Sequence, residues 1–175
     1  MVVVPKDLDA ALDEQTELHC IGGFAIVQAY GLGRATADID VLSVVPCSSG
    51  ARLLELAGKE SLLRKEHGIY LDVVTVATAP ADYLARVRPL YPGVWQNLHL
   101  FVLEAHDLAL TKLERNFERD RADVAHLASA GYLQPAILRE RYCKELRPYI
   151  VGRESWHDQT LELWLDAYFP SESPR

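Results

Sequence analysis

The stretch CIGGFAIVQAYGLGRATADIDVLSVV, residues 20–45, decides the fold. Its pattern predicts a strand, a glycine turn, a helix and a second strand, in that order, at residues 18–21, 22–23, 24–30 and 39–45. Two aspartates, Asp38 and Asp40, open the second strand, which is otherwise apolar. A charge at the mouth of a buried strand is costly unless something there needs it, so this pair marks a candidate site.

Outward from this stretch, the first hundred residues alternate strand and helix. Further strands are predicted at residues 68–76 and 98–103, and helices at residues 6–14, 49–56 and 81–87. Pro89, Pro92 and Gly93 predict a loop. From Ala105 onward the pattern is helical throughout, with helices predicted over residues 104–116, 119–130, 134–146 and 158–169. The fold class is therefore α/β (α+β): a small mixed sheet with flanking helices over residues 1–104, and a helical region over 105–175 packed on it.

Composition narrows the class of protein. The chain has 175 residues and a net charge of −7, which argues against wide non-specific wrapping of nucleic acid. Its three cysteines, Cys20, Cys47 and Cys143, lack CxxC spacing and suggest reduced thiols in a cytoplasmic protein. The N-terminal apolar run is too short for a signal peptide, and no run of about 18 apolar residues spans a membrane.

The acidic residues predict a metal site. Side chains alternate along a strand, so Asp38 and Asp40 share a face about 7 Å apart. Asp72 lies inside the strand predicted at residues 68–76. We expect this strand to run beside the strand that carries Asp38 and Asp40. Three converging carboxylates repel one another unless they hold a hard cation such as Mg²⁺, which is bound through carboxylates and substrate phosphates.

The glycine pair predicts a phosphate cradle. A strand that ends at Gly22 and Gly23 and turns into a helix lets backbone N–H groups approach an anion closely, and the positive end of the helix dipole adds to the attraction. Arg34 and Thr36, just before the aspartates, either contact phosphate or finish the loop. Taken alone, the glycines indicate only a tight turn, and Asp38 only a cap.

These features together resemble the signature of the nucleotidyltransferase superfamily: strand, small-residue turn, helix, then Asp-apolar-Asp on the next strand. The third carboxylate of that family stands on a later strand, and Asp72 matches it. The resemblance implies that Asp38, Asp40 and Asp72 bind Mg²⁺ or Mn²⁺, and that a nucleoside triphosphate lies over Gly22 and Gly23. Asp72 would also help to activate an acceptor hydroxyl.

A second resemblance lies in DLALTKLERNFERDRADVAHL, residues 107–127, which is similar to the second half of AbiEii-like nucleotidyltransferases, the toxins of type IV toxin–antitoxin pairs. There a helical lysine is followed by an Arg-Asp pair, matched here by Lys112 and by Arg119 with Asp120. The resemblance implies that Lys112 steadies the phosphates and that Asp120 is a base toward the acceptor or orients Lys112. It also implies a tRNA or protein acceptor and a cognate antitoxin.

The helical half adds candidate phosphate ligands. If the helix over this segment is continuous, Lys112, Arg115 and Arg119 share one face and suit a triphosphate. A break near residues 116–117 would let Asp120 cap the next helix or turn inward, and Asp123 is the alternative that falls on the Lys112 face. The competing interpretation is a solvated helix with i,i+4 ion pairs.

The sequence also departs from the family pattern. Gly23 stands where the family usually has serine, so a phosphate-contacting hydroxyl is missing, and the interval from Gly23 to Asp38 is slightly longer than usual. This favours a rival interpretation, a non-catalytic nucleotide- or partner-binding module on the same fold. The three acids favour the enzyme, because a retired site has no need of three costly carboxylates. A third alternative is transfer of the nucleotide to a small molecule.

Overall fold

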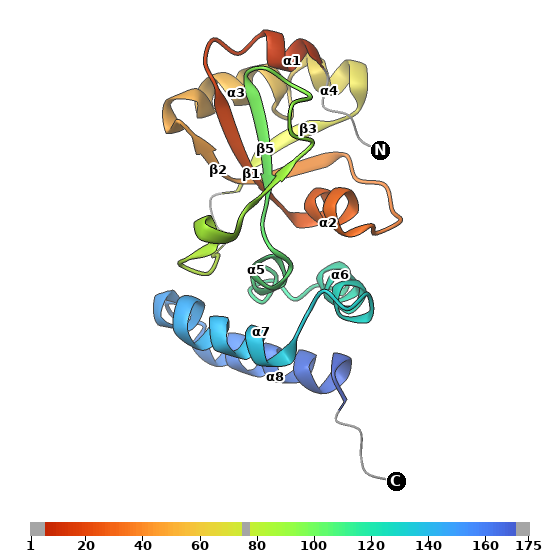
Figure 1. Cartoon of the computed structure of the whole chain (residues 1–175), viewed down its shortest axis with the longest axis vertical. Coiled ribbons are helices and arrows are strands. Elements are labelled where there is room, and N and C mark those ends of the chain that lie inside the picture. Colours follow the sequence, from red (N-terminus) through yellow and green to blue (C-terminus); the bar gives the residue numbers. More distant parts are fainter. Residues whose placement is uncertain (1–5, 75–77, 171–175) are drawn as a thin grey trace. The chain divides into compact units, whose positions relative to one another are not determined.

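The computed structural model describes residues 6–74 and 78–170 (Figure 1). Its backbone divides into two compact units, and each is described by itself. The first unit comprises Met1–Val76 and Val87–Leu103, and the second comprises Ala77–Arg86 and Glu104–Arg175.

A five-stranded mixed sheet forms the centre of the first unit. The strands are β1 (Thr16–Ile21), β2 (Asp38–Val45), β3 (Tyr70–Val73), β4 (Arg88–Leu90) and β5 (Leu98–Val102), in the spatial order β3-β2-β1-β5-β4. β2 is antiparallel to β1 and parallel to β3, while β5 is parallel to β1 and antiparallel to β4. Strand β1, at the centre, is almost wholly buried, which explains why its sequence, TELHCI, is largely apolar at its inner end.

Four helices accompany this sheet: α1 (Lys6–Ala10), α2 (Gly22–Tyr30), α3 (Gly50–Ala57) and α4 (Leu62–His67). Figure 1 shows α1, α3 and α4 gathered at one end of the unit. Helix α2 ends at Gly31, whose φ of +71° is the left-handed conformation that glycine adopts without cost. Its last residue, Tyr30, is buried and donates its hydroxyl proton to the backbone oxygen of Leu103 over 2.7 Å. These contacts fix α2 behind the turn at Gly22.

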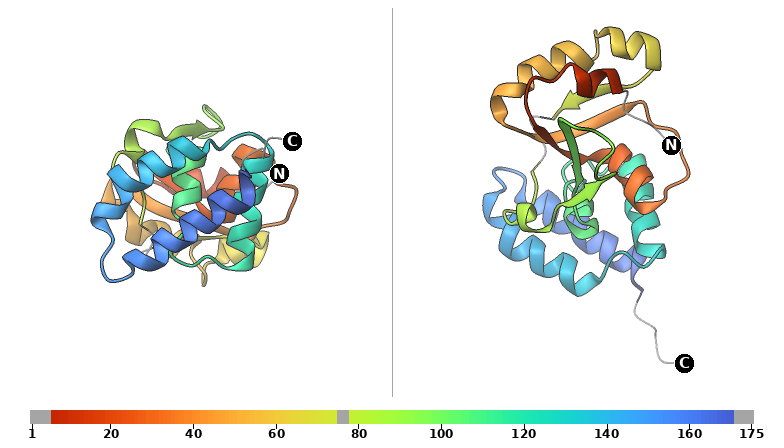
Figure 2. Two further views of the ribbon diagram at one scale, coloured as in Figure 1. Left: turned by 90° about the horizontal axis from the view of Figure 1, so that it is seen from below. Right: turned by 45° about the horizontal axis from the view of Figure 1, so that its top comes forward.

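The second unit is helical. It contains a 3₁₀ turn (Tyr83–Arg86), α5 (Ala105–Leu110), α6 (Glu118–Ser129), α7 (Pro135–Arg141) and α8 (Glu154–Tyr168); the chain after α7 continues as a π-helical turn (Tyr142–Leu146) and a 3₁₀ turn (Arg147–Tyr149). Helices α7 and α8 run side by side (Figure 2). No helix in the described part of the chain is both long and apolar enough to cross a bilayer.

A largely buried ionic network ties Arg86, the last residue of the 3₁₀ turn, to the helical part of the second unit. Arg86 donates Nε–H and Nη2–H to the two carboxylate oxygens of Asp107 over 2.8 and 3.0 Å, and it also pairs with Glu145. Nη1 of Arg141 donates to Oδ1 of Asp107 over 2.9 Å and also to Oε2 of Glu104. Asp107 is completely buried, so its charge is compensated by two guanidinium groups, as a buried carboxylate requires.

The predicted fold class, a mixed sheet with flanking helices and a helical C-terminal part, is confirmed, but several element predictions were wrong. Helix α4 was missed, and residues 88–90 form edge strand β4 rather than a loop, because proline is tolerated where no ladder hydrogen bond is needed. The helix predicted at 81–87 is only the short 3₁₀ turn, and β3 is described only at Tyr70–Val73, with residues 75–76 outside the described part.

The most consequential difference concerns the helix predicted over residues 104–116. Helix α5 ends at Leu110, and α6 begins only at Glu118, with turns between them. Asn116 adopts a left-handed φ of +48°, and its side-chain oxygen accepts the indole N–H of Trp164 at 3.1 Å. A continuous helix is impossible through such a residue, so the helical face predicted for Lys112, Arg115 and Arg119 does not exist.

Candidate functional site

The register of the sheet brings the three predicted acids to one face of the first unit. Strand β2 pairs with β3 in parallel, and Asp40 stands directly opposite Asp72 while Asp38 stands opposite Tyr70. Residues paired in this way, and residues two apart on one strand, point to the same face. Burial agrees, because Asp38, Asp40 and Asp72 are half-buried while Ile39 and Leu71, between them, are buried on the other face. Asp38, Asp40, Tyr70 and Asp72 are called the acidic face below.

A bulge in the β1–β2 ladder sets Asp40 beside the glycine turn. The register shifts between His19 and Cys20, so that Asp40 becomes the partner of Ile21, the last residue of β1. Gly22 follows at once and has a left-handed φ of +66°. A Cβ atom at Gly22 would lie 2.0 Å from Oδ2 of Asp40. Only glycine therefore fits here, both for its backbone angle and because the carboxylate occupies the space of a side chain.

Substitution at this turn tests the close contact. We expect Gly22→Ala to destabilise the chain by at least about 1–2 kcal/mol through the left-handed backbone alone, with a further cost because the Asp40 carboxylate must move. Urea denaturation measures the change in the free energy of unfolding. Gly33→Ala is the matched control, because a Cβ at Gly33 meets nothing within 4 Å. Equal midpoints for the two variants would contradict this interpretation of Gly22.

The negative charge of Asp40 affects the neighbouring thiol of Cys20. Burial, and then the charge of Asp40, raise the pKa of the Cys20 thiol to about 12. That thiol is completely buried, so Cys20 packs as part of the core. The negative potential at the end of β1 belongs to the carboxylate, not to a thiolate.

The other two carboxylates each contact a neighbouring side chain. The Thr36 hydroxyl donates to Oδ1 of Asp38 over 2.7 Å and lies 3.2 Å from the Asp38 backbone oxygen, so it orients this carboxylate, while its contact with phosphate stays a prediction. Oδ2 of Asp72 accepts a hydrogen bond from Nζ of Lys59 at 2.7 Å. Arg34, the other predicted loop ligand, is half-buried, and its backbone N–H donates to Leu32 over 2.9 Å.

The donor set of the acidic face suits a hard divalent cation. All three groups are carboxylates, and they are partly exposed, so that water or phosphate oxygens can complete an octahedral shell. As they stand, no three Asp, Glu, His or Cys side chains among the described residues gather closely enough to hold a metal ion. The carboxylate of Asp38 accepts a hydrogen bond from Thr36, and the carboxylate of Asp72 accepts one from Lys59.

The predicted residues of the helical half form a different structure inside the second unit. Nζ of Lys112 lies 2.8 Å from Oδ2 of Asp123 and 3.3 Å from Oδ1 of Asp120, and all three side chains are at least 97% buried. Asp120 caps α6 by accepting the backbone N–H of Phe117 at 3.2 Å, and it also binds Nη2 of Arg115 at 2.8 Å. The break that would let Asp120 cap the next helix is present, and Asp123, the alternative to Asp120, contacts Lys112. Arg119 is exposed on α6.

Five carboxyl groups in the described part of this unit have lowered pKa values, and Glu104 and Asp120 are the two that burial opposes most strongly. Burial would raise the pKa of Glu104, but hydrogen bonds and charges from His106 and Arg141 outweigh it and bring the value to about 2. Burial would also raise the pKa of Asp120. The hydrogen bond from Arg115 and the charge of Lys112 outweigh this effect, so the pKa of Asp120 lies below its usual range. Both groups therefore favour folding in their charged form.

These shifts give a pH dependence with a definite sign. The folded pKa of Glu104 lies below the unfolded one, so its contribution to stability is complete above about pH 5 and is lost as the pH falls toward 2. We expect Glu104→Gln to be less stable than the parent chain at pH 7, with the difference shrinking between pH 5 and pH 2. Chemical denaturation across this range measures it. A difference that grows with acid would contradict the assignment.

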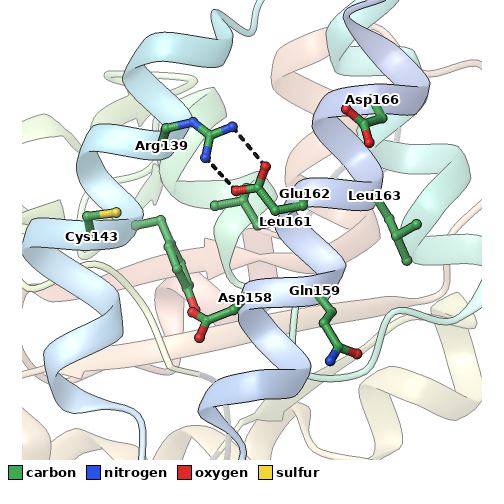
Figure 3. A pocket seen from close by; sticks show the side chains of 9 residues that line it. Arg139, Cys143, Asp158, Gln159, Leu161, Glu162, Leu163 and Asp166 are labelled. Atoms are coloured by element: carbon green, nitrogen blue, oxygen red, sulfur yellow. Dashed lines mark hydrogen bonds and ion pairs between the residues drawn. The ribbon is translucent and has the colours of Figure 1, made fainter.

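A separate groove lies between α7 and α8 (Figure 3). It has a volume of about 550 Å³ and is lined by Arg139, Tyr142, Cys143, Asp158, Gln159, Leu161, Glu162, Leu163 and Asp166. Arg139 and Glu162 form the ion pair at its upper edge, with an Nη2–Oε2 distance of 2.9 Å. None of these residues was predicted from the sequence to be functional. No residue of the acidic face lines this groove.

Sequence reasoning missed the cations beside the acidic face. Lys59 and Arg64 both lie near the ring of Tyr70, with Nζ and Cζ at 5.6 and 5.1 Å from its centroid. Tyr70 belongs to the acidic face through its pairing with Asp38. No periodic signal distinguishes an exposed lysine in a turn, so only the register of β3 reveals that these residues converge.

Comparison with known proteins gives one finding. A family model described as "Nucleotidyltransferase of unknown function (DUF6036)" matches residues 4–168, almost the whole chain. No curated protein and no solved structure matches the chain.

Proposed function

The chain belongs to the family of nucleotidyltransferases of unknown function (DUF6036), and from this membership we propose that it transfers a nucleotidyl group from a nucleoside triphosphate to a hydroxyl group, aided by Mg²⁺ or Mn²⁺. One observation carries the proposal: Asp40 and Asp72 are in register on adjacent parallel strands, with Asp38 on the same face. Three carboxylates on one face repel one another, and a divalent cation is the partner that makes the arrangement favourable.

Each residue of the acidic face has a proposed part. Asp38 and Asp40 hold the metal against the triphosphate, and Asp72 completes the metal site and accepts the proton of the acceptor hydroxyl. The bound metal supplies charge neutralisation for the phosphates. The acceptor oxygen forms a bond to the α-phosphorus, the bond to the β-phosphate oxygen breaks, and pyrophosphate leaves. The chain's contribution is positioning and electrostatics rather than covalent chemistry.

The glycine turn supports nucleotide binding beside the metal. Gly22 and Gly23 open α2, where backbone N–H groups and the helix dipole favour an anion. On the side of Gly22 that a Cβ would fill, the space is taken by the Asp40 carboxylate, so phosphate would approach from the other side of the turn. Asp40 would help to hold the metal, whose charge would offset the repulsion between the carboxylate and the phosphates.

The second unit favours RNA as the acceptor. Phe117 and Trp156 are 64% and 42% exposed, and a guanidinium lies 5.8 Å from each ring, Arg115 over Phe117 and Arg153 over Trp156. Exposed aromatic rings flanked by arginine suit the stacking of unpaired bases, with the arginines near the phosphates. A protein hydroxyl is the other acceptor class. The likeness to AbiEii-like toxins adds the proposal that a cognate antitoxin restrains the activity.

The rival function is binding without turnover. Two observations support it. Gly23 lacks the hydroxyl that is usual at that position of the turn, and Lys59 already forms an ion pair with Asp72, one of the three carboxylates. The rival is a nucleotide- or partner-binding module, and only the enzyme requires a metal on the acidic face.

A label-transfer assay separates them. The protein is incubated with each α-labelled nucleoside triphosphate and Mg²⁺ or Mn²⁺, together with total tRNA in one arm and a nucleic-acid-free cell lysate in the other. We expect label on the tRNA. EDTA should abolish the transfer completely, and excess Mg²⁺ should restore it. Label on protein alone would mean that the acceptor is a protein hydroxyl rather than RNA. Nucleotide binding with no transfer to any acceptor would overturn the enzyme in favour of the binding module.

A further inference from the structure

Lys59 is held at the tip of a well-defined turn between α3 and α4. The turn begins at Gly58, where a Cβ would stand 2.4 Å from the backbone oxygen of Leu54, so no other residue fits without a shift. Nη1 of Arg64 donates to the backbone oxygen of Lys59 over 2.7 Å, and the Ser61 hydroxyl caps α4 by accepting the backbone N–H of Arg64. The backbone of Lys59 is thus fixed while its side chain is 53% exposed.

From this turn the lysine ammonium reaches the acidic face. Nζ lies 2.7 Å from Oδ2 of Asp72. A lysine ammonium is positively charged at neutral pH. A divalent ion held by the acidic face would therefore feel its repulsion.

The Lys59–Asp72 ion pair is weak enough to dissociate. Both partners are partly exposed, with 40% of the Asp72 side chain accessible, and exposed ion pairs are weak. The four-carbon stem of lysine lets the ammonium swing without backbone movement. Arg64 provides a second cation near the Tyr70 ring, so the Lys59 ammonium and a guanidinium lie close to the same aromatic side chain.

We propose that Lys59 is an internal counter-cation, displaced from Asp72 when a divalent metal binds, and that it then binds, with Arg64, the phosphates of the metal-bound nucleotide. The inference rests on the proposed function, since it concerns the same metal site. It explains why the acids do not gather as they stand: a lysine occupies the cation's place at Asp72. It also gives one residue two effects of opposite sign.

Those effects are measured with two probes. Mn²⁺ alone is titrated and the unbound ion followed by electron paramagnetic resonance, and binding of inorganic triphosphate is measured by calorimetry at saturating Mn²⁺. For Lys59→Met we expect Mn²⁺ to bind about tenfold more tightly, because a repelling charge is gone, and triphosphate to bind about tenfold more weakly. Lys65→Met, which removes an equally exposed lysine from α4, should change both constants by less than about twofold.

The outcomes separate the inference from the function beneath it. Unchanged or weaker Mn²⁺ binding in Lys59→Met, or unchanged triphosphate binding, overturns the counter-cation. Asp72→Asn tests the site itself: if neither it nor Asp40→Asn weakens Mn²⁺ binding by the parent chain, the metal site of the proposed function fails as well. If Lys59→Met binds Mn²⁺ and the parent chain does not, competition by the lysine is complete and the inference stands. Circular dichroism confirms that each variant is folded.

Discussion

Asp40→Asn is expected to lower metal-dependent label transfer by about 10³-fold, since a metal-ligand carboxylate contributes several kcal/mol to stabilising the transition state. Asp40 is chosen over its neighbours because it alone combines the register with Asp72 and the contact with the glycine turn. The substitution keeps the shape of the side chain and removes a charge from a face that carries three, so we expect no loss of folding stability. Steady-state transfer rates and a thermal melt measure the two quantities.

The control for this variant is Asp166→Asn, which makes the same chemical change at an exposed position of α8. It should transfer label at the parental rate. If Asp40→Asn is also as active as the parent chain, Asp40 is not a metal ligand and the acidic face is not the reaction centre. If the variant is inactive because it is unfolded, the melt shows it, and Asp38→Asn provides the same test at the neighbouring position.

Lys112→Met is expected to destabilise the chain by about 3–5 kcal/mol, because it leaves the buried carboxylates of Asp120 and Asp123 without their shared cation. Arg115 still compensates Asp120, so Asp123 bears most of the loss. Urea denaturation of the parent and the variant measures the free energy. Arg119→Ala, on the exposed surface of α6, should change it by less than about 0.5 kcal/mol.

A double substitution separates charge burial from packing at this site. In Lys112→Met with Asp123→Leu, the uncompensated carboxylate is gone, so part of the stability should return, with a coupling of about 0.5–3 kcal/mol. A double variant as unstable as the sum of the two single variants would show that the ion pair itself contributes nothing. A single variant within about 0.5 kcal/mol of the parent would contradict the buried network.

The sequence was most informative where local patterns agree with one another. Alternation of apolar and acidic residues placed Asp38 and Asp40 on a strand, and the glycines marked the turn before α2; both depend only on neighbouring residues. The strand that carries Asp72 was expected to run beside the first, and in the sheet β2 pairs with β3 so that Asp40 stands opposite Asp72. What alternation could not give was the bulge that brings Asp40 against Gly22.

The errors have a common physical cause, which is tertiary contact overriding local preference. The segment DLALTKLERN has good helical periodicity, yet the chain breaks there because Lys112 turns inward to Asp123, and Asn116 is held by Trp164, 48 residues later. The Lys59–Asp72 pair is likewise invisible in the sequence, because two exposed, oppositely charged residues 13 positions apart are common and carry no periodic signal.

The acidic face is tested most directly by diffraction from crystals grown with Mn²⁺ and a non-hydrolysable triphosphate analogue. The proposal predicts an anomalous scattering peak at coordination distance from the carboxylates of Asp40 and Asp72, with phosphate oxygens completing the shell. A Mn²⁺ peak elsewhere, or an acidic face that keeps the Lys59–Asp72 pair with the analogue bound, would contradict it.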